Sequence, residues 1–543
     1  MSPRKAIQSK PVRIKGGYAL RLILLGLLQL PASGCGLSHW IHNGFKVGPE
    51  YCCPPQVAVE ETWIEGDPQL IPCPPDYPDW WAAFDDPILN DLIQTAYQQN
   101  LSLREAGWRV MQARAQHAIV SANLFPKTQQ GFADFERIQE SKSVALPAPL
   151  RAFDEWSTGF SLSWELDVWG RFRRSIASAD AQVEVSVADY DAILLSLIAE
   201  VATAYNDYRT FQHRLEYAQS NVYIQEESLK LTQEKADAGK TGYTSVHLAK
   251  SNLESTRAII PALEIGRRQA ANRLCTLLGI PTRDLKAELG TGNIPAIPPE
   301  VGVAVGIPAE LLRRRPDIRA AERAIAAQSE QIGIAVAELY PHFSINGQIA
   351  LESEEFSQLF TSASTSGAIG PSIRWNLLNY GRVINNVRLQ GFGLEELVAS
   401  YRNTVLTANQ EVEDAMVAFL RNQDRVRFLE AAEKETEEAL RLLRIAFDDD
   451  AVDFTGVFIL QGDLVSKQDQ LAQARGDVAA SLINLYKALG GGWEIRCPGF
   501  QPQSLASPQP LPAPRDETRY PDLPEQEESL PLPAVLTHEQ ADD

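Results

Sequence analysis

The sequence predicts a mainly helical chain with a small β-barrel, built from two copies of one structural unit. Three observations predict this fold class. A motif recurs about 200 residues later, proline is absent from 150–260 and from 372–497, and short segments alternate apolar with polar residues. Stretches without proline that are rich in Ala, Leu, Glu, Gln and Arg favour helix. Alternation with a period of two is typical of a strand with one apolar face.

The duplication is visible in the motif itself. Residues 163–171 read SWELDVWGR and residues 374–382 read RWNLLNYGR, an offset of 211 (374 minus 163). Upstream, residues 124–126 fall on 339–341 at an offset of 215 (339 minus 124), so an insertion or deletion separates the two stretches. Because this period is far longer than a solenoid repeat, we interpret it as duplication of a whole structural half.

The repeat predicts a division of the chain into five parts. These are a signal peptide at 1–34, a lipid-anchored N-terminal arm at 35–86, a first repeat at 87–300, a second repeat at 301–496, and a Pro-rich, acidic, disordered tail at 497–543. The strands are expected at about 127–139 and 157–168 in the first repeat, and at about 342–352 and 367–378 in the second. The segment at 127–139 alternates poorly, and the repeat is the main reason to predict a strand there.

Very long helices follow the recurring motif in each copy. Helices are expected at 87–125, 172–237, 243–279, 308–340, 383–448 and 454–490. The two longest would each extend about 100 Å at 1.5 Å per residue. Pro261 should kink or split the helix that contains it. A helix this long cannot bury its apolar stripe alone, so it is expected to pack along its neighbours as a coiled coil.

The N-terminus has the pattern of an export signal. A basic start precedes the apolar run 22–30, and small residues at 32–34 precede Cys35. The apolar run is too short to span a bilayer as a helix. A cysteine after small residues is similar to a bacterial lipoprotein box, although Ala32 stands where Leu is usual. We therefore expect acylation of Cys35, and the alternative is ordinary cleavage that leaves Cys35 as a structural thiol.

Several classes of chemistry find no support in the sequence. A net charge of −20 argues against nucleic acid as a partner. No nucleophile motif, cofactor loop or metal-ligand spacing is present, so we expect no enzyme activity, no cofactor and no metal site. The glycines at 490–492 indicate a helix end rather than a phosphate loop. A disulfide among Cys52, Cys53, Cys73 and Cys497 is compatible with export but cannot be assigned, and Cys275 is expected to stay unpaired.

The predicted strands require partner chains. Side chains expected to face lipid are Phe160, Leu162, Trp164, Phe343, Ile345, Ile373 and Trp375, and those expected to face water are Ser161, Ser163, Glu165, Arg374 and Asn376. A barrel in a bilayer must close, and known ones have at least eight strands. Four strands per chain therefore require at least two chains, and three chains would give twelve strands and a wider lumen. The alternative is a soluble helical protein with two exposed hairpins.

Four separate segments resemble one family. Residues 307–323 (IPAELLRRRPDIRAAER), 470–493, 45–54 and 80–93 are similar to motifs of the outer-membrane factor (TolC-like) family, in its NodT-type lipoprotein branch, and they occur in the family's order. The resemblance covers roughly 40–495. It implies a homotrimer with a twelve-stranded β-barrel that continues into a periplasmic α-helical barrel. It also implies a periplasmic adaptor and an inner-membrane pump of the RND type as partners, with the barrel in outer-membrane lipid.

Two further groups of residues are candidate functional sites. The first is the linker motif Arg313, Arg314, Arg315, Pro316 and Asp317, where the arginines are expected to pair with carboxylates of a neighbouring segment, or else to form a solvated face. The second is the turn that carries Asp448, Asp449, Asp450 and Asp453, as candidates for the periplasmic aperture. Like charges there would attract cations or raise a pKa, and the alternative is a solvated turn. Where the family often has Asp, this chain has His247 and Ile459.

The expected function is an outer-membrane channel subunit of a tripartite efflux system that exports small molecules such as drugs or metals. The alternative of the same architecture is the outer-membrane channel of a type I protein secretion system. A tether that only spans the envelope is a third possibility. The sequence does not specify the cargo.

Overall fold

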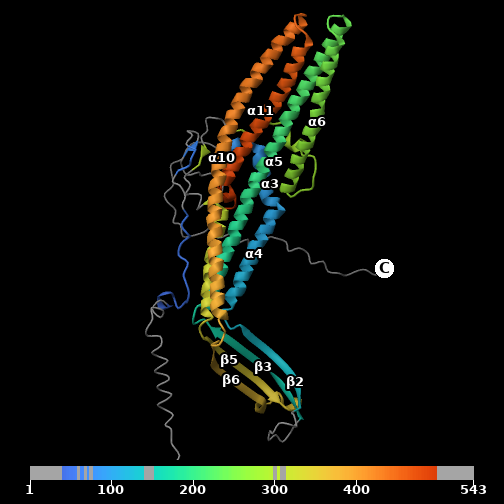
Figure 1. The fold of residues 1–543 in the computed structure, drawn as a ribbon. Coiled ribbons are helices and arrows are strands. Elements are labelled where there is room, and N and C mark those ends of the chain that lie inside the picture. The colour runs from blue at the N-terminus through green and yellow to red at the C-terminus, as the bar shows by residue number, and fades with distance from the viewer. Residues whose placement is uncertain are drawn as a thin grey trace, which may run out of the picture. The chain divides into compact units, whose positions relative to one another are not determined.

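The computed structural model describes residues 40–57, 62–65, 70–71, 78–139, 152–296, 303–305 and 314–497. The signal peptide, Cys35, Cys73, Arg313 and the tail from 498 lie outside the described residues. The helices are α3 (Pro87–Gln99), α4 (Leu101–Ala122), α5 (Arg171–Asp237), α6 (Tyr243–Leu277), α7 (Lys286–Leu289), α9 (Pro316–Ala337), α10 (Arg382–Asp448) and α11 (Phe454–Ala488) (Figure 1). The strands are β1 (Leu70–Ile71), β2 (Thr128–Gln139), β3 (Ala152–Leu166), β4 (Val303–Ala304), β5 (His342–Ser353) and β6 (Thr365–Arg374).

The chain separates into two compact units, which are described one at a time. The strand unit contains residues 111–184 and 322–399 with the N-terminal part up to Pro55. The helical unit contains residues 56–110, 185–321 and 400–543. Within the described residues, no helix combines the length and the apolar character needed to cross a membrane.

The strand unit is built on one antiparallel sheet in the order β2-β3-β5-β6. β3 begins at Ala152, earlier than the predicted 157, and pairs with β2 from Ala152 to Ser163. β6 ends at Arg374, so the predicted strand 367–378 is too long. The reason is that Arg374 pairs with His342, the first residue of β5, and Pro341 before it has no N–H to extend the ladder.

The helical stretch predicted at 87–125 forms two helices, because Asn100 divides it. The Asn100 backbone N–H donates to Ala96 O and ends α3, while its side-chain Oδ1 accepts from Leu103 N at 2.8 Å and begins α4. Asn is a favoured capping residue because its short side chain satisfies a free N–H at a helix start. In the other copy α9 begins at Pro316, and residues 306–313, where the predicted helix would begin, lie outside the described residues.

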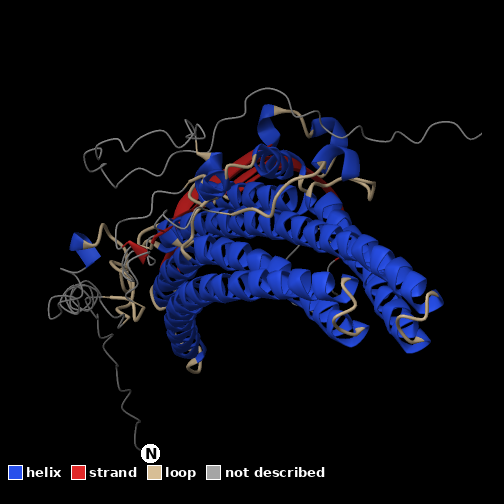
Figure 2. Ribbon diagram, turned by 90° about the horizontal axis from the view of Figure 1, so that it is seen from above, coloured by secondary structure: helices blue, strands red, loops and turns tan. Residues whose placement is uncertain are grey.

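The long helices match one another in length. α5 and α10 each contain 67 residues, and α6 and α11 each contain 35. Pro261 lies inside α6, which stays one helix, so the predicted split does not occur. In the helical unit these four helices run alongside one another (Figures 1 and 2).

Specific polar pairs fix the order of helices in the helical unit. Arg257 on α6 reaches Glu226 on α5 at 2.6 Å, and Arg214 on α5 reaches Asp469 on α11 at 2.7 Å. Asn422 on α10 donates to Ser481 Oγ on α11 at 2.7 Å. The main core of this unit is apolar and includes Trp80, whose ring stacks on that of Tyr486 with 5.2 Å between centroids.

Candidate functional site

The sheet of the strand unit has one apolar face. Opposed residues of an antiparallel pair project to the same side. Trp164 pairs with Ile345, Leu166 pairs with Phe343, and Phe343 pairs with Ile373. The register therefore gathers six of the seven predicted lipid-facing residues on one side, and these are Phe160, Leu162, Trp164, Phe343, Ile345 and Ile373. Three isoleucines on this face, Ile349, Ile369 and Ile373, are at least 60% exposed.

The seventh residue, Trp375, lies beyond the end of β6 and is half exposed. Its indole Nε1 donates to Leu339 O at 3.0 Å. At the offsets of the predicted repeat the matching bond is that of Trp164 Nε1 to Leu124 O, also 3.0 Å. The two tryptophans thus make the same contact with the residues that precede Pro126 and Pro341.

The opposite face of the sheet is polar and hydrogen-bonded across three strands. Ser163 Oγ donates to Asn346 Oδ1 at 2.8 Å, and Asn346 Nδ2 donates to Ser372 Oγ at 2.8 Å. Glu165 on the same face accepts from Arg171 and lies 2.8 Å from His342 Nδ1. One sheet with an apolar and a polar face fits a boundary between lipid and water.

A second candidate site is the turn between α10 and α11. The Lys235 ammonium, 8% exposed at the end of α5, donates to the carbonyl oxygens of Phe447 and Asp448 and lies 2.7 Å from Asp450 Oδ1. Lys240 lies 2.7 Å from the other carboxylate oxygen of Asp450. The hydrogen bonds from Lys235 and then Lys240 hold the pKa of Asp450 below its ordinary value. Asp450 is therefore paired with two lysines of the same chain.

Asp450 also has an unusual backbone. Its φ is +58°, in the left-handed region where a residue with a Cβ is strained. At the repeat offset of 211 the matching residue in the turn between α5 and α6 is Gly239, with φ of +73°. Glycine takes this conformation without cost. The chain thus holds an aspartate where the other turn has glycine, and the two lysine contacts offset its strain.

The remaining carboxylates of this turn differ from Asp450. Asp453 is the N-cap of α11, and its Oδ1 accepts from Thr455 N at 2.9 Å. The carboxylates of Asp448 and Asp449 are exposed, with no hydrogen-bond or ion-pair partner among the described residues. Ile459 is 59% exposed, and His247 is exposed as expected. Of the four predicted aperture residues, Asp450 and Asp453 are therefore engaged within the chain, and Asp448 and Asp449 are not.

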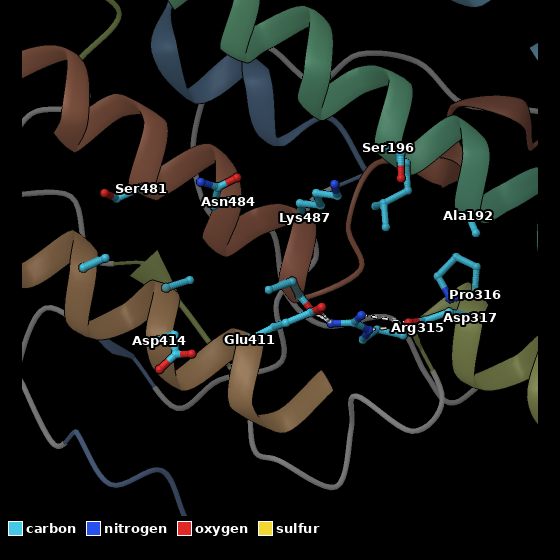
Figure 3. Close-up of a pocket in the computed structure, with 14 residues that line it drawn as sticks. Ala192, Ser196, Arg315, Pro316, Asp317, Glu411, Asp414, Ser481, Asn484 and Lys487 are labelled. Atoms are coloured by element: carbon cyan, nitrogen blue, oxygen red, sulfur yellow. Dashed lines mark hydrogen bonds and ion pairs between the residues drawn. The ribbon is translucent and has the colours of Figure 1, made fainter. Parts of the chain in front are cut away.

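The linker motif lies at a cavity of about 520 Å³ in the helical unit. Arg315 is buried and its guanidinium contacts Glu411 at 2.6 Å and Asp317 at 2.8 Å (Figure 3). Pro316 is the first residue of α9, and Asp317 lies in the first turn. Lys487 from α11 and Asp414 from α10 complete the charged lining. Arg315 thus makes the predicted pairing with a neighbouring segment, while Arg314 makes no comparable contact among the described residues.

Arg315 also has a counterpart at the repeat offset of 215, which is Asn100. Arg315 Nη1 donates to Ala488 O at 3.1 Å, and Asn100 Nδ2 donates to Leu277 O at 2.8 Å. Ala488 and Leu277 are themselves related by the offset of 211. Each bond therefore joins the start of a short helix to the end of α6 or α11 in the same way.

A buried charged cluster was not predicted from the sequence. Asp191 on α5 is fully buried and contacts Arg319 at 2.8 Å and the guanidinium of Arg496. Both guanidiniums lie over the ring of Trp493, at 4.3 and 5.5 Å from it. The available signal was an aspartate within the apolar run 190–195, because an acid in such a position needs a cation.

The sequence matches a known protein family and several of its members. The family model described as "Outer membrane efflux protein" matches residues 92–280 and 307–491. The chain is 31% identical over 459 residues to nodulation protein T of Rhizobium leguminosarum bv. trifolii, covering 83% of this chain and 95% of that protein. It is 30% identical over 417 residues to the toluene efflux pump outer membrane protein TtgF of Pseudomonas putida, covering 76% and 85%.

Solved structures show the same fold. The outer-membrane channel OprN superposes with a TM-score of 0.75 at 32% identity, covering 82% of this chain and 99% of OprN. The fold and the matched sequence pattern are those of channel proteins rather than of enzymes.

Proposed function

Because this chain belongs to the outer membrane efflux protein family, we propose that it is the outer-membrane channel of a tripartite export system. Proteins of this family lie in the outer membrane and extend into the periplasm. The observation that carries the proposal is the four-stranded sheet with one apolar and one polar face, joined to 67-residue helices. Such a chain can supply part of a barrel wall and part of a duct that continues it.

The barrel is proposed to close with three chains. Within the described chain, β2 and β6 are the two edges of the sheet. Lipid cannot satisfy the free N–H and C=O groups of an edge strand, so these edges must pair with other copies. Twelve strands from three chains would leave a lumen, whereas eight from two would be filled by side chains.

The internal duplication is also part of the proposal, and three matched pairs of contacts support it. The bonds of Trp164 and Trp375 match, and so do those of Asn100 and Arg315. Gly279 and Gly490, related by the offset of 211, both have φ above +70°. Gly279 lies against Gln99 and Asn100, just before α4, and Gly490 lies against Arg315, just before α9. Two halves that repeat their contacts in this way would place six similar units around a trimer.

The duplication predicts which helices meet between subunits. Within the chain, α5 packs on α11, where Asn206 Nδ2 donates to Gly476 O at 2.9 Å. The offset of 211 maps Asn206 to Val417 on α10 and Gly476 to Ile265 on α6. Both are exposed apolar side chains, at 38% and 59%. We propose that α10 of one subunit packs on α6 of the next, because this contact repeats the α5–α11 contact and covers both side chains.

The partners and cargo of the channel extend the same proposal. A periplasmic adaptor and an inner-membrane RND pump would complete the system, and acylated Cys35 would anchor each chain to outer-membrane lipid. Small molecules are the proposed cargo, because relatives of similar length are named for efflux, toluene being the substrate in the name of one. Intact mass of the mature protein should show a start at Cys35 with acyl groups. An unmodified start would leave only a cleaved signal.

The aperture is proposed to involve Asp448 and Asp449. These carboxylates are exposed and unpaired among the described residues, whereas Asp450 and Asp453 are engaged. In a trimer they would place six free carboxylates near one another. Negative charges so arranged attract cations and repel one another until protons or cations share them.

Planar-bilayer recording tests both the proposed channel and the proposed aperture residues. The purified protein should conduct ions with a preference for cations, and the double variant Asp448→Asn/Asp449→Asn should lose most of that preference. Asp453→Asn is the matched control, since asparagine caps a helix as well as aspartate does. Absence of conductance would contradict a channel. Conductance with unchanged selectivity in the double variant would show that other residues form the aperture, and it would not contradict the channel.

A further inference from the structure

Two adjacent cysteines lie within the N-terminal arm. Cys52 and Cys53 are both exposed, and their Sγ atoms lie 3.4 Å apart. A disulfide bond is about 2.05 Å long, so the two sulfurs touch as reduced thiols without being bonded. The described cysteines are all free, and Cys73, the remaining candidate for a disulfide, lies outside the described residues. Cys275 is buried and unpaired, as expected.

The segment just before the pair is fixed to the strand unit. Arg174, fully buried, donates through Nε to Val47 O at 2.8 Å and through Nη2 to Gly48 O at 3.2 Å. Gly48 lies so close to Gly333 that a Cβ on Gly48 would meet Gly333 Cα at 2.6 Å. The arm therefore cannot move away from its support without breaking several buried contacts.

The residues after the pair restrict it further. Pro54 and Pro55 follow directly, and a proline confines the residue before it to extended conformations. Cys53 is thus held between an anchored arm and a stiff dipeptide. Two thiols with limited freedom lose little entropy when one ligand bridges them.

The separation of the sulfurs selects the kind of ligand. With a metal–sulfur bond of about 2.3 Å, sulfurs 3.4 Å apart subtend an angle of about 95° at the bridged atom. Linear two-coordinate ions such as Cu(I) or Hg(II) would need the sulfurs on opposite sides. A tetrahedral zinc ion would need two more ligands, and the described residues contain no cluster of three or more His, Cys, Asp or Glu side chains. A three-coordinate pyramidal atom, whose bond angles are close to right angles, fits the separation of the two sulfurs.

We propose that Cys52 and Cys53 form a vicinal dithiol site for trivalent arsenic or antimony compounds. The two thiols condense with an As(III) oxide or hydroxide. Two As–S bonds form, the As–O bonds break, and the two thiol protons leave with the oxygen as water, so no electrons are transferred. The hydrogen bond with Cys52 raises the pKa of the Cys53 thiol, which favours the protonated form that this condensation consumes. The site belongs to this chain's own arm and does not depend on the proposed channel.

Phenylarsine oxide is the probe, used on the full-length protein in detergent after reduction and removal of the reductant. The wild type should take up one equivalent that survives excess monothiol and is removed by a 1,2-dithiol. Cys52→Ser and Cys53→Ser should each bind about 10²–10⁴-fold more weakly, because one sulfur then binds alone. Cys497→Ser is the matched control and should bind like the wild type. Intact mass and a competition titration give the stoichiometry and the affinity.

Three outcomes would overturn the proposal. One is equal binding by the wild type and the Cys52→Ser/Cys53→Ser double variant. Another is no monothiol-resistant adduct on the reduced wild type, including the case in which the pair re-forms a disulfide before it binds. The third is preference for Zn²⁺ over the arsenical in direct competition. Trypsin resistance of the variants, compared with the wild type, separates loss of the site from loss of the fold.

Discussion

Helices α5 and α10 have the same length and matched positions, yet they differ in what covers them. Leu195 and Asn206 on α5 are 8% and 1% exposed. The residues at the offset of 211 on α10, Leu406 and Val417, are 57% and 38% exposed, and Phe428 continues the row at 65%. These three residues on α10 are spaced by 11, which is close to three helical turns, so they form one stripe. We call it the α10 stripe.

The difference between α5 and α10 supports the proposal that one subunit supplies only part of a repeating arrangement. α5 finds its cover in the same chain, on α11, α9 and the segment after α11. The α10 stripe has no such cover among the described residues. An apolar stripe of this kind would promote aggregation if it stayed exposed to water, so we expect another copy of the chain to bury it. The predictions below test the two sides of this comparison, beginning with the largest effect.

The largest loss of stability is expected from removing the buried ion pairs of Asp191 on α5. Asp191→Ala leaves the guanidiniums of Arg319 and Arg496 without their carboxylate. Removing one partner of a buried ion pair costs about 3–5 kcal/mol. Denaturant unfolding should show this loss. Glu288→Ala is the control, because Glu288 pairs with Arg283 on an exposed surface, where a loss of about 0–1 kcal/mol is expected. Similar losses in both variants would show that Asp191 does not fix the cover of α5.

A smaller effect is expected from the close contact of α5 with α11. A Cβ on Gly476 would lie 2.3 Å from Thr210 Oγ1, so Gly476→Val must displace a packed side chain. Overpacking of this kind costs about 1–3 kcal/mol. Adding Thr210→Ala should restore much of the loss, which a double-mutant cycle in denaturant would measure. Additive losses would mean that the two helices do not meet at this point.

The smallest effect concerns the two turns. Asp450→Asn keeps a residue that tolerates positive φ but removes the charge that Lys235 and Lys240 hold. Backbone amides around 447–453 should then exchange several-fold faster at pH 7, while those around 237–242 change less.

The pH dependence has a definite sign. The pKa of Asp450 is lowered in the folded chain. The stabilisation that its carboxylate gains from Lys235 and Lys240 is therefore fully present above the ordinary Asp pKa of about 3.9, and it is lost as pH falls through the lower folded value. The wild type should therefore approach the exchange rate of the variant only below about pH 4. Equal exchange rates in the two proteins at pH 7 would show that the lysine contacts do not hold this turn.

Much of the fold could be predicted from patterns that repeat. Alternation of apolar and polar residues, together with the repeat, placed the strands. The absence of proline and the helix-forming composition placed the long helices. The break at Asn100 was missed, since one capping side chain decided it against a continuous helical pattern. The end of β6 was misplaced because a ladder stops where its partner strand stops.

The candidate sites were less predictable than the fold. The acidic turn was visible in the sequence, but the pairing of Asp450 with Lys235 and Lys240 depends on two turns about 210 residues apart along the chain. The contacts of Asp191 with Arg319, and of Arg315 with Glu411, likewise join residues that lie far apart along the chain. Spacing along one segment cannot report such contacts, because tertiary packing brings the partners together.

Disulfide cross-linking tests the central claim most directly. Val417→Cys and Ile265→Cys are combined in one chain whose Cys52, Cys53 and Cys73 are replaced by Ser. The proposed contact of α10 with α6 of the next subunit predicts that oxidation joins three chains into one covalent species. Asn221→Cys with Gln468→Cys is the control, because these side chains hydrogen-bond within one chain at 2.7 Å and should cross-link without raising the mass. Oxidised Val417/Ile265 protein that still migrates as a single chain, while the control pair cross-links, would contradict the account.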